Sequence, residues 1–266
     1  MQHISSRQNP IVARYRAARD REREIDPVLL DGMHLVSEAL DHGAPLRDVV
    51  IADRAVERTE MRDLLGKLAR ARVDVKAAAP LVMSALSPVR SPSSVVALTD
   101  APDLRDERAQ RRLFEGKSPL AVIGYNIQDP GNIGAIIRVA EAAGATGVVV
   151  GTHSADPFGW KAVRGSMGSA LRLPLMRDTV DGMAIARRCG CRIVAMMPRG
   201  GRSIYELDLT RATAIVIGGE GPGLGLDLLD DCDEQVTIPM RTPVESLNAA
   251  VTAAVVLYEA HRQRST

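Results

Sequence analysis

Apolar segments dominate residues 118–266 and predict an α/β domain with a parallel sheet. Continuous apolar runs alternate there with segments in which apolar positions recur every three or four residues. The runs predict buried strands at 119–127, 146–152, 192–198, 212–219 and 234–240. The periodic segments predict helices at 131–145, 160–171, 180–190 and 244–262. Apolar strands separated by helices are typical of a parallel sheet covered on both faces.

Residues 1–99 have a different rhythm, and we interpret them as a small α/β domain. Helix-like segments at 9–22, 33–43, 60–71 and 79–87 alternate with strand-like segments at 27–32, 46–53, 73–79 and 94–100. Residues 100–117 combine proline with dense charge and little periodicity, which is typical of a linker. The sequence therefore predicts a domain at 1–99, a linker at 100–117 and a second domain at 118–266.

Composition narrows the class of protein. The chain has 266 residues, of which 45% are hydrophobic and 25% charged, as in globular proteins with one large or two modest domains. No run of about 18 or more apolar residues occurs, and the N-terminal residues lack the hydrophobic core of a signal peptide. We therefore expect a cytoplasmic protein without a membrane span. Neither the histidines nor the three cysteines (Cys189, Cys191 and Cys232) have metal-site spacing, so we expect no metal and structural thiols.

Charge gives only a local indication of a nucleic-acid partner. The formal net charge is +1, which by itself points to no polyanion. Arg7, Arg14 and Arg16 precede a run of mixed charges, and either phosphate binding or an ordinary solvated helix face explains them. Aromatic residues make up 3% of the chain, which argues against an RNA-binding sheet built on stacked aromatic rings.

The first of three candidate loops leads into the helix at 131–145. Ligands of open parallel sheets bind beyond the carboxyl ends of the strands, so loops that follow strands are candidate ligand sites. Asn132 is a candidate helix cap and an exposed amide at the helix start. Arg138 lies among small and apolar residues, where a guanidinium is costly to bury unless an anion meets it. An ordinary ion pair with Glu141, three residues along the helix, is the alternative.

The other two loops lie late in the chain. In residues 215–225 glycines surround Glu220 after a buried strand, so that backbone can approach a ligand closely, although a plain turn is the alternative. The loop lacks the G-x-G-x-x-G pattern and follows a late strand, which argues against a nicotinamide oxidoreductase. In residues 238–256, Ser246 and Asn248 begin a helix rich in alanine and valine, and a cap explains only one of them.

In order and spacing, the three loops resemble the three motifs of the SpoU (TrmH-type) ribose 2′-O-methyltransferases, within the SPOUT superfamily. The motifs are NIQDPGNIGAIIRVAEAAGA, IVIGGEGPGLG and IPMRTPVESLNAAVTAAVVLYEA, and the similarity covers residues 118–262. The third motif has Ala249 and Ala250 where the family commonly has Val-Ser, but it keeps the core Ser-Leu-Asn at 246–248. Residues 1–99 resemble, more loosely, the L30e-like RNA-binding domain that precedes the catalytic domain in many members.

The resemblance implies a fold, a cofactor and a set of site residues. It implies a C-terminal parallel α/β domain with a trefoil knot, a homodimer formed through that domain, and S-adenosylmethionine as the cofactor. The implied cofactor-binding residues are Gly218, Gly219, Ile238, Met240, Ser246 and Leu247. The implied catalytic residues are Asn132, Arg138, Glu220, Ser246 and Asn248.

The implied reaction is methylation of a ribose 2′-hydroxyl in RNA, with ribosomal RNA favoured over transfer RNA by analogy. In this family the residue that Arg138 resembles is often assigned as the base, but a guanidinium holds its proton too tightly to be a good base. We therefore expect Arg138 to bind the target phosphate and to stabilise the negative charge that develops on the attacking oxygen. A non-catalytic RNA-binding or ribosome-assembly factor of the same fold is the alternative. Arg164 and Ser166 have either an RNA-contacting or a structural role.

Overall fold

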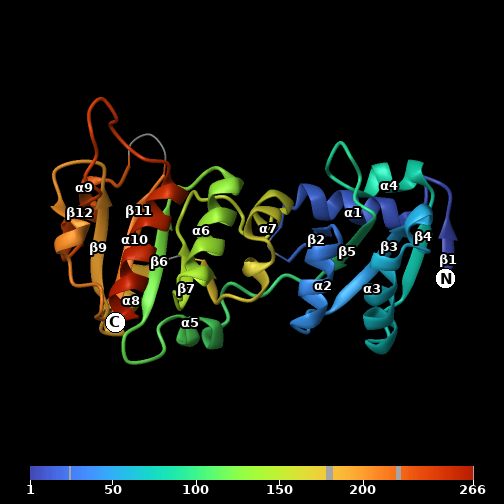
Figure 1. Cartoon of the computed structure of the whole chain (residues 1–266), viewed down its shortest axis with the longest axis horizontal. Coiled ribbons are helices and arrows are strands. Elements are labelled where there is room, and N and C mark those ends of the chain that lie inside the picture. Colours follow the sequence, from blue (N-terminus) through green and yellow to red (C-terminus); the bar gives the residue numbers. More distant parts are fainter. Residues whose placement is uncertain (24, 178–181, 220–222, 266) are drawn as a thin grey trace. The chain divides into compact units, whose positions relative to one another are not determined.

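Two sheets organise the chain, and each belongs to a separate unit. The computed structural model describes residues 1–23, 25–177, 182–219 and 223–265. One unit comprises Met1–Asp103 and Phe158–Arg172, and the other comprises Leu104–Pro157 and Leu173–Thr266 (Figure 1). The boundary at Asp103 falls inside the segment interpreted as a linker. Residues 158–172 lie within the predicted second domain in sequence, yet they pack with the first unit.

The first unit holds a mixed sheet of order β1-β4-β3-β5-β2. Strand β5 is antiparallel to both of its neighbours, and the other pairs are parallel. The strands are β1 (Gln2–Ile4), β2 (Val28–Asp31), β3 (Leu46–Ala52), β4 (Val75–Ala78) and β5 (Val95–Thr99). The helices are α1 (Pro10–Asp20), α2 (Met33–Asp41), α3 (Thr59–Arg70), α4 (Pro80–Leu86) and α7 (Trp160–Ser166), with one-turn helices at Asp53–Ala55 and Ser169–Leu171. The sequence pattern predicts all of these elements except β1 and the turn at Asp53.

The segment 158–172 joins the first unit through specific contacts. Phe158 is buried, and the Arg21 guanidinium lies 5.6 Å from the centre of its ring. Trp160 packs against the apolar cluster that contains Tyr15. Arg172 forms an ion pair with Glu38 of α2. Apolar burial and charge pairing together explain why this segment leaves the sheet whose strands it follows in sequence.

The second unit is built on a seven-stranded sheet in which every pair is parallel, as predicted. Its order is β10-β12-β9-β11-β6-β7-β8, with the first strand of the unit near the middle (Figure 1). The strands are β6 (Leu120–Tyr125), β7 (Gly147–Val150), β8 (Leu175–Arg177), β9 (Arg192–Met197), β10 (Arg202–Ser203), β11 (Thr213–Gly218) and β12 (Glu234–Thr237). The α/β fold class with a parallel sheet is thereby confirmed, whereas the trefoil knot stays a prediction.

Helices cover both faces of this sheet. Residues of α5 (Glu107–Leu113), α8 (Gly182–Arg188) and α9 (Leu226–Asp230) share one apolar cluster with alternate residues of β6, β9 and β11. Helices α6 (Pro130–Ala142) and α10 (Ala249–Arg264) pack against each other, α6 against β7 and α10 against β11 (Figure 1). A one-turn helix at Ile204–Glu206 follows β10. No helix among the described residues is long and apolar enough to cross a membrane.

Three local expectations are wrong, each for a physical reason. Residues 107–113 form α5 inside the expected linker, because Asp106 caps the helix and Leu113 reaches the apolar core. Asp129, and not Asn132, caps α6: its carboxylate accepts from the amide of Asn132. Helix α10 begins at Ala249 rather than near 244–246, because the side chain of Asn248 caps it. The first residues of the helix expected at 180–190 lie outside the described residues.

Candidate active site

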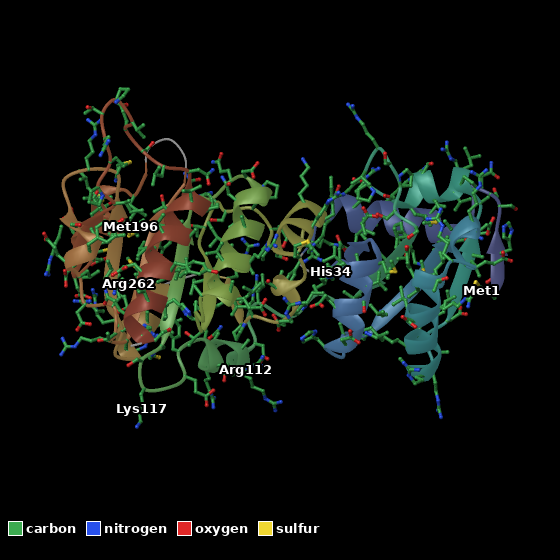
Figure 2. The ribbon with its side chains drawn as sticks, in the orientation of Figure 1. Met1, His34, Arg112, Lys117, Met196 and Arg262 are labelled. Atoms are coloured by element: carbon green, nitrogen blue, oxygen red, sulfur yellow. The ribbon has the colours of Figure 1, made fainter. Side chains whose placement is uncertain are left out.

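A cavity of about 450 Å³ lies where the carboxyl ends of β9, β11 and β12 meet the start of α10. Met196, which is labelled in Figure 2 and lies next to the last residue of β9, lines it. The described residues that line it are Met196, Met197, Pro198, Ile217, Gly218, Gly219, Gly223, Leu224, Ile238, Met240, Ser246, Leu247, Asn248, Ala249 and Thr252. All six residues expected to bind the cofactor are in this set.

Glycine at 218 and 219 permits a close approach of backbone segments on one wall of the cavity. A Cβ at Gly219 would lie 1.8 Å from the carbonyl oxygen of Asn126, and one at Gly218 would lie 2.8 Å from the carbonyl carbon of Gly223. The amide of Gly219 donates to the carbonyl of Tyr125 over 2.8 Å. The loop after β11 therefore rests directly on the loop after β6. Glu220, the expected acid of this motif, lies outside the described residues.

Two asparagines join the starts of α6 and α10 beside the cavity. The Nδ2 of Asn248 donates to the Oδ1 of Asn132 over 3.1 Å. The Oδ1 of Asn248 accepts from the amides of Ala250 and Val251, so this one side chain caps α10 and holds Asn132. The amide of Asn132 in turn donates to the carboxylate of Asp129 over 2.9 Å. This network fixes two side-chain amides next to the residues expected to bind the cofactor.

Arg138 projects from α6 as an exposed cation. It lies six positions after Asn132, about 9 Å further along the helix axis. Within the part of the chain that the structure describes, Arg138 forms no hydrogen bond or ion pair. The alternative of an ordinary pair with Glu141 is therefore not realised. An exposed guanidinium without a partner retains all of its donors for an anion from outside the chain.

Ser246 and Leu247 complete the third loop. Ser246 is exposed and lines the cavity, two residues before Asn248. Leu247 is partly buried and contributes apolar wall, as do Ile238 and Met240. The cavity thus combines apolar walls, exposed backbone at the glycines and a few polar side chains, which is the composition of small-molecule sites in general.

The arginines expected to bind RNA in the first unit differ in their surroundings. Arg14 pairs with both carboxylate oxygens of Asp48 at 2.7 Å, so its charge is already balanced. Arg7 donates to the carbonyl of Leu81 over 3.0 Å and keeps its charge without a counter-ion there. Arg16 is exposed on α1. Arg7 and Arg16 therefore offer more positive potential to a phosphate than Arg14 does.

The two residues of α7 have contrasting environments. Ser166 is buried, donates to the carbonyl of Val163 and accepts from the amide of Ala170, which is a structural arrangement. Arg164 is half exposed and lies 3.7 Å from Asp31. Burial raises the pKa of Asp31, although a hydrogen bond from Ser87 opposes the shift. The described residues contain no group of histidine, cysteine or acidic side chains placed to hold a metal ion.

Residues 119–258 match the sequence profile of the SpoU rRNA Methylase family. The chain belongs to this family. A 23S rRNA (uridine(2479)-2'-O)-methyltransferase of Streptomyces viridochromogenes is 34% identical to it over 255 residues, which are 92% of this chain and 86% of that protein. The 23S rRNA (guanosine(2553)-2'-O)-methyltransferase RlmP of Bacillus subtilis is 25% identical over 261 residues, 97% of this chain and 98% of that protein.

Solved structures give the same result for this SpoU-family protein. The SpoU methyltransferase AviRb of Streptomyces viridochromogenes, in complex with AdoMet, superposes with a TM-score of 0.86 at 32% identity, covering 97% of this chain and 99% of that one. An AdoMet-bound rRNA methyltransferase of Sinorhizobium meliloti superposes with a TM-score of 0.82 at 27% identity, covering 98% of this chain and 97% of that one. The family predicted from the three motifs is confirmed.

Some residues of this SpoU-family site were not predicted from the sequence. Met196, Met197 and Pro198 line the cavity because β9 lies beside β11, and no local pattern specifies that strand order. Asp129 positions Asn132, and Asp-Pro-Gly at 129–131 is in itself only a turn signal. The preference of aspartate for the N-cap, directly before a proline at the first helical position, was the signal that could have identified it.

Proposed function

We propose that this protein methylates a ribose 2′-hydroxyl of RNA with S-adenosylmethionine as the methyl donor. The observation that supports this most is the joint placement of the three motifs. The cavity contains every residue expected to bind the cofactor, and the Asn132–Asn248 pair lies beside it. The names of the relatives favour ribosomal RNA, and we propose 23S ribosomal RNA as the substrate class.

The cavity fits S-adenosylmethionine by size and chemistry. Its volume of about 450 Å³ lies within the range of small-molecule sites. Ile238, Met240 and Leu247 offer apolar surface for the flat adenine ring, and the backbone at Gly218 and Gly219 can approach the ligand without interference from side chains. When bound, the cofactor supplies a methyl group on a positively charged sulfur, which an oxygen nucleophile can attack.

Arg138 would hold the RNA and support the charge of the reaction. Its guanidinium carries a permanent charge and a planar fork of donors that matches a phosphate. Negative charge grows on the ribose 2′-oxygen as its proton leaves, and a fixed cation nearby lowers the barrier to that step. Asn132, Ser246 and Asn248 would position ribose and cofactor for in-line attack. Glu220 would orient Arg138 or relay the proton.

The first unit would recognise the RNA substrate. We propose that residues 1–99 form an L30e-like substrate-binding domain and that the catalytic domain with its trefoil knot lies within residues 118–266, with α5 added to it from the segment 100–117 and residues 158–172 packed on the first unit. Arg7 and Arg16 support this role, because neither is paired with a carboxylate among the described residues. Arg14 would contribute only if a phosphate displaced Asp48. We place the enzyme in the cytoplasm, where ribosomal RNA is found.

We also propose that two chains associate through the catalytic domain. Val251 and Tyr258 are 48% and 52% exposed on α10, and their spacing of two helical turns puts them on one face. Val244, in the loop before α10, is 50% exposed. Large apolar side chains gathered in this way favour a protein partner. Sedimentation should show a dimer, and Val251→Arg should shift it toward the monomer; a monomeric wild type would contradict the proposal.

Transfer of label from S-adenosylmethionine to RNA tests the function. The protein is incubated with labelled cofactor and unmodified total RNA, and the RNA is separated by size. We expect label in the large ribosomal RNA fraction, and about 10²–10³-fold slower labelling with Arg138→Ala. Label in transfer RNA would correct the substrate class. An absence of both label and cofactor binding in a titration would support the runner-up, a non-catalytic RNA-binding or assembly factor.

A further inference from the structure

The loop that follows β7 is tied to the loop that carries the first motif. Beyond the last paired residues of β6 and β7, Gly124 and Val150, backbone bonds continue from Gly151 to Gly124 and from Asn126 to Thr152, over 2.7 and 3.2 Å. The two exit loops therefore extend the contact between the strands up to the start of α6. Within this contact a single hydroxyl, that of Ser154, bridges two backbone groups of the other loop.

The Ser154 hydroxyl uses both of its hydrogen-bonding functions. Its Oγ donates to the carbonyl of Gly124 over 3.2 Å and accepts from the amide of Ile127 over 3.1 Å. The next residue, Ala155, donates its amide to the carbonyl of Ile127 over 2.9 Å. Both backbone groups of Ile127, which is 1% exposed, thus depend on the loop after β7. Without the hydroxyl, the amide of Ile127 would be left without this partner in a water-poor place.

The position of Ile127 bears on the site because α6 begins three residues later. From Ile127 the chain passes to the cap Asp129 and then to Asn132, whose side chain meets Asn248. On its other side the loop is held by a hydrogen bond from the backbone amide of Gly219 to the carbonyl of Tyr125. Asn126 has φ of 54°, in the left-handed region that asparagine adopts more readily than most residues with a side chain. The first motif is therefore held between two neighbouring loops, one of which acts through Ser154.

We propose that Ser154 is a positioning residue for the methyl transfer: by fixing Ile127 it sets the start of α6 and hence the placement of Asn132 opposite Asn248. The proposal rests on the proposed function of that pair. Ser154 does not line the cavity. Its loss should therefore change the turnover number kcat and leave the affinity for the cofactor as it is.

The experiment compares Ser154→Ala with a matched control at the opposite end of the same two strands. There the Thr146 hydroxyl donates to the carbonyl of Leu120 over 3.0 Å. Thr146→Val replaces that hydroxyl with a methyl group and leaves the rest of the side chain as it is. Both variants should lower Tm by a few degrees, about 2–4 °C. We expect kcat to fall about tenfold in Ser154→Ala, because small misplacements of reacting groups cost that much or more, and to stay unchanged in Thr146→Val. Both should bind S-adenosylmethionine with the wild-type Kd.

Two further variants separate positioning from general stability. Ser154→Thr keeps the hydroxyl and should return kcat to within about twofold of the wild type. In an Asn132→Ala background, Ser154→Ala should lower kcat little further, because the effects of two residues are not additive when one acts through the other. Equal kcat in Ser154→Ala and Thr146→Val, or full additivity with Asn132→Ala, would overturn the positioning role alone. A wild type without methyl transfer would overturn it together with the proposed function.

Discussion

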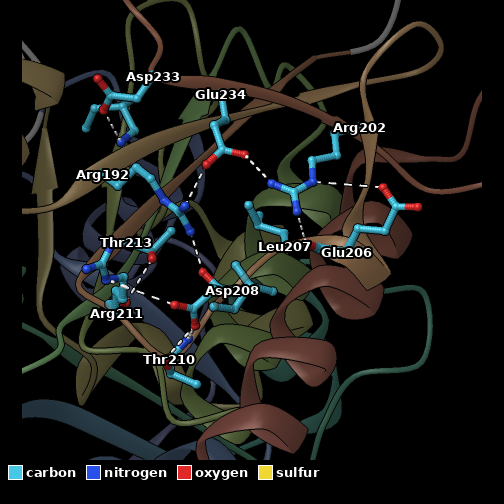
Figure 3. A network of polar contacts seen from close by, with 12 residues as sticks. Arg192, Arg202, Glu206, Leu207, Asp208, Thr210, Arg211, Thr213, Asp233 and Glu234 are labelled. Atoms are coloured by element: carbon cyan, nitrogen blue, oxygen red, sulfur yellow. Dashed lines mark hydrogen bonds and ion pairs between the residues drawn. The ribbon is translucent and has the colours of Figure 1, made fainter.

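The two ends of the seven-stranded sheet treat their polar groups in opposite ways. At the amino ends of the strands, charged side chains bind other parts of the chain. Arg192, the first residue of β9, pairs with Glu234, the first residue of β12, over 2.6 Å, and Arg202 approaches the same carboxylate at 3.6 Å (Figure 3). Arg264, in the last turn of α10, donates to the carbonyls of Ser118, Leu209 and Arg211 over 2.6–2.7 Å.

At the carboxyl ends, the cavity leaves polar groups open to a ligand, beside the paired side chains of Asn132 and Asn248. Arg138, about 9 Å along α6 from Asn132, is exposed and, within the described residues, has no partner. The cavity is lined by Ser246 and by the backbone of Gly218 and Gly219. Parallel sheets place all carboxyl ends on one side, so a single edge can collect loops from distant parts of the sequence. We infer that the amino end of the sheet stabilises the fold, while the carboxyl end is available for chemistry.

The largest expected effect is that of Arg138→Ala on catalysis. Loss of one group that stabilises developing charge typically lowers kcat by about 10²–10³-fold. Because Arg138 binds no other described residue, Tm should stay within about 1 °C of the wild type. Initial rates of labelled methyl transfer, together with thermal melts, measure both. Arg138→Lys keeps the charge but loses the fork, and should recover only part of the rate.

Arg264→Ala should show the reverse pattern at the other end of the sheet. Its guanidinium satisfies three backbone carbonyls, so its removal should lower the free energy of unfolding by about 2–3 kcal/mol. The rate per folded molecule at 25 °C should not change. Urea unfolding and the methyl-transfer rate test this. If Arg264→Ala loses activity while it keeps its stability, the assignment of the amino end to folding alone is wrong.

Asn248→Asp separates the two roles of Asn248 in the site, the cap of α10 and the hydrogen bond to Asn132. Aspartate caps a helix as well as asparagine does, so the bonds to Ala250 and Val251 persist. The carboxylate cannot donate to the Oδ1 of Asn132, so the present hydrogen bond is lost and Asn132 has to reverse its amide to bond to residue 248 again. We expect kcat to fall about tenfold with little change in Tm. In Asn248→Ala, loss of the cap should add about 1 kcal/mol of destabilisation.

The smallest expected effect is a pH dependence at the amino end. The bidentate contact with Arg262, together with Gln263, lowers the pKa of Glu259 to about 2, well below its ordinary value. A group whose pKa is lowered in the folded state contributes stability above its unfolded pKa, and that stability is lost as pH falls toward the folded value. The Tm difference between the wild type and Glu259→Gln should therefore be present at pH 7 and shrink between about pH 4.5 and pH 2. A constant difference would contradict this assignment.

Most of the fold could be predicted from the sequence because buried parallel strands are continuous apolar runs. Strand β10 could not, since Arg202 and Ser203 become a strand only by pairing with β12. The dense charge of residues 107–113 hides α5, whose core contact rests on Leu113. The place of residues 158–172 in the first unit depends on packing of Phe158 and Trp160 that no local pattern encodes.

The candidate site could be predicted in its members but not in its geometry. The motifs named Asn132 and Asn248, yet a hydrogen bond between residues 116 positions apart follows only from the folded chain. The alternative that paired Arg138 with Glu141 was equally consistent with helical spacing and is excluded only by the structure. Likewise, the role of Ser154 depends on which loops lie side by side, and that depends on strand order.

The most direct test of the central claim is the chemical position of the transferred methyl group. RNA labelled by the wild type is digested with alkali, which needs a free 2′-hydroxyl to cleave the chain. We predict that the label is recovered in an alkali-resistant dinucleotide and that Arg138→Ala forms this product about 10²–10³-fold more slowly. Label recovered in mononucleotides would mean that a base is methylated, and would contradict the assignment of the carboxyl edge of this sheet to ribose chemistry.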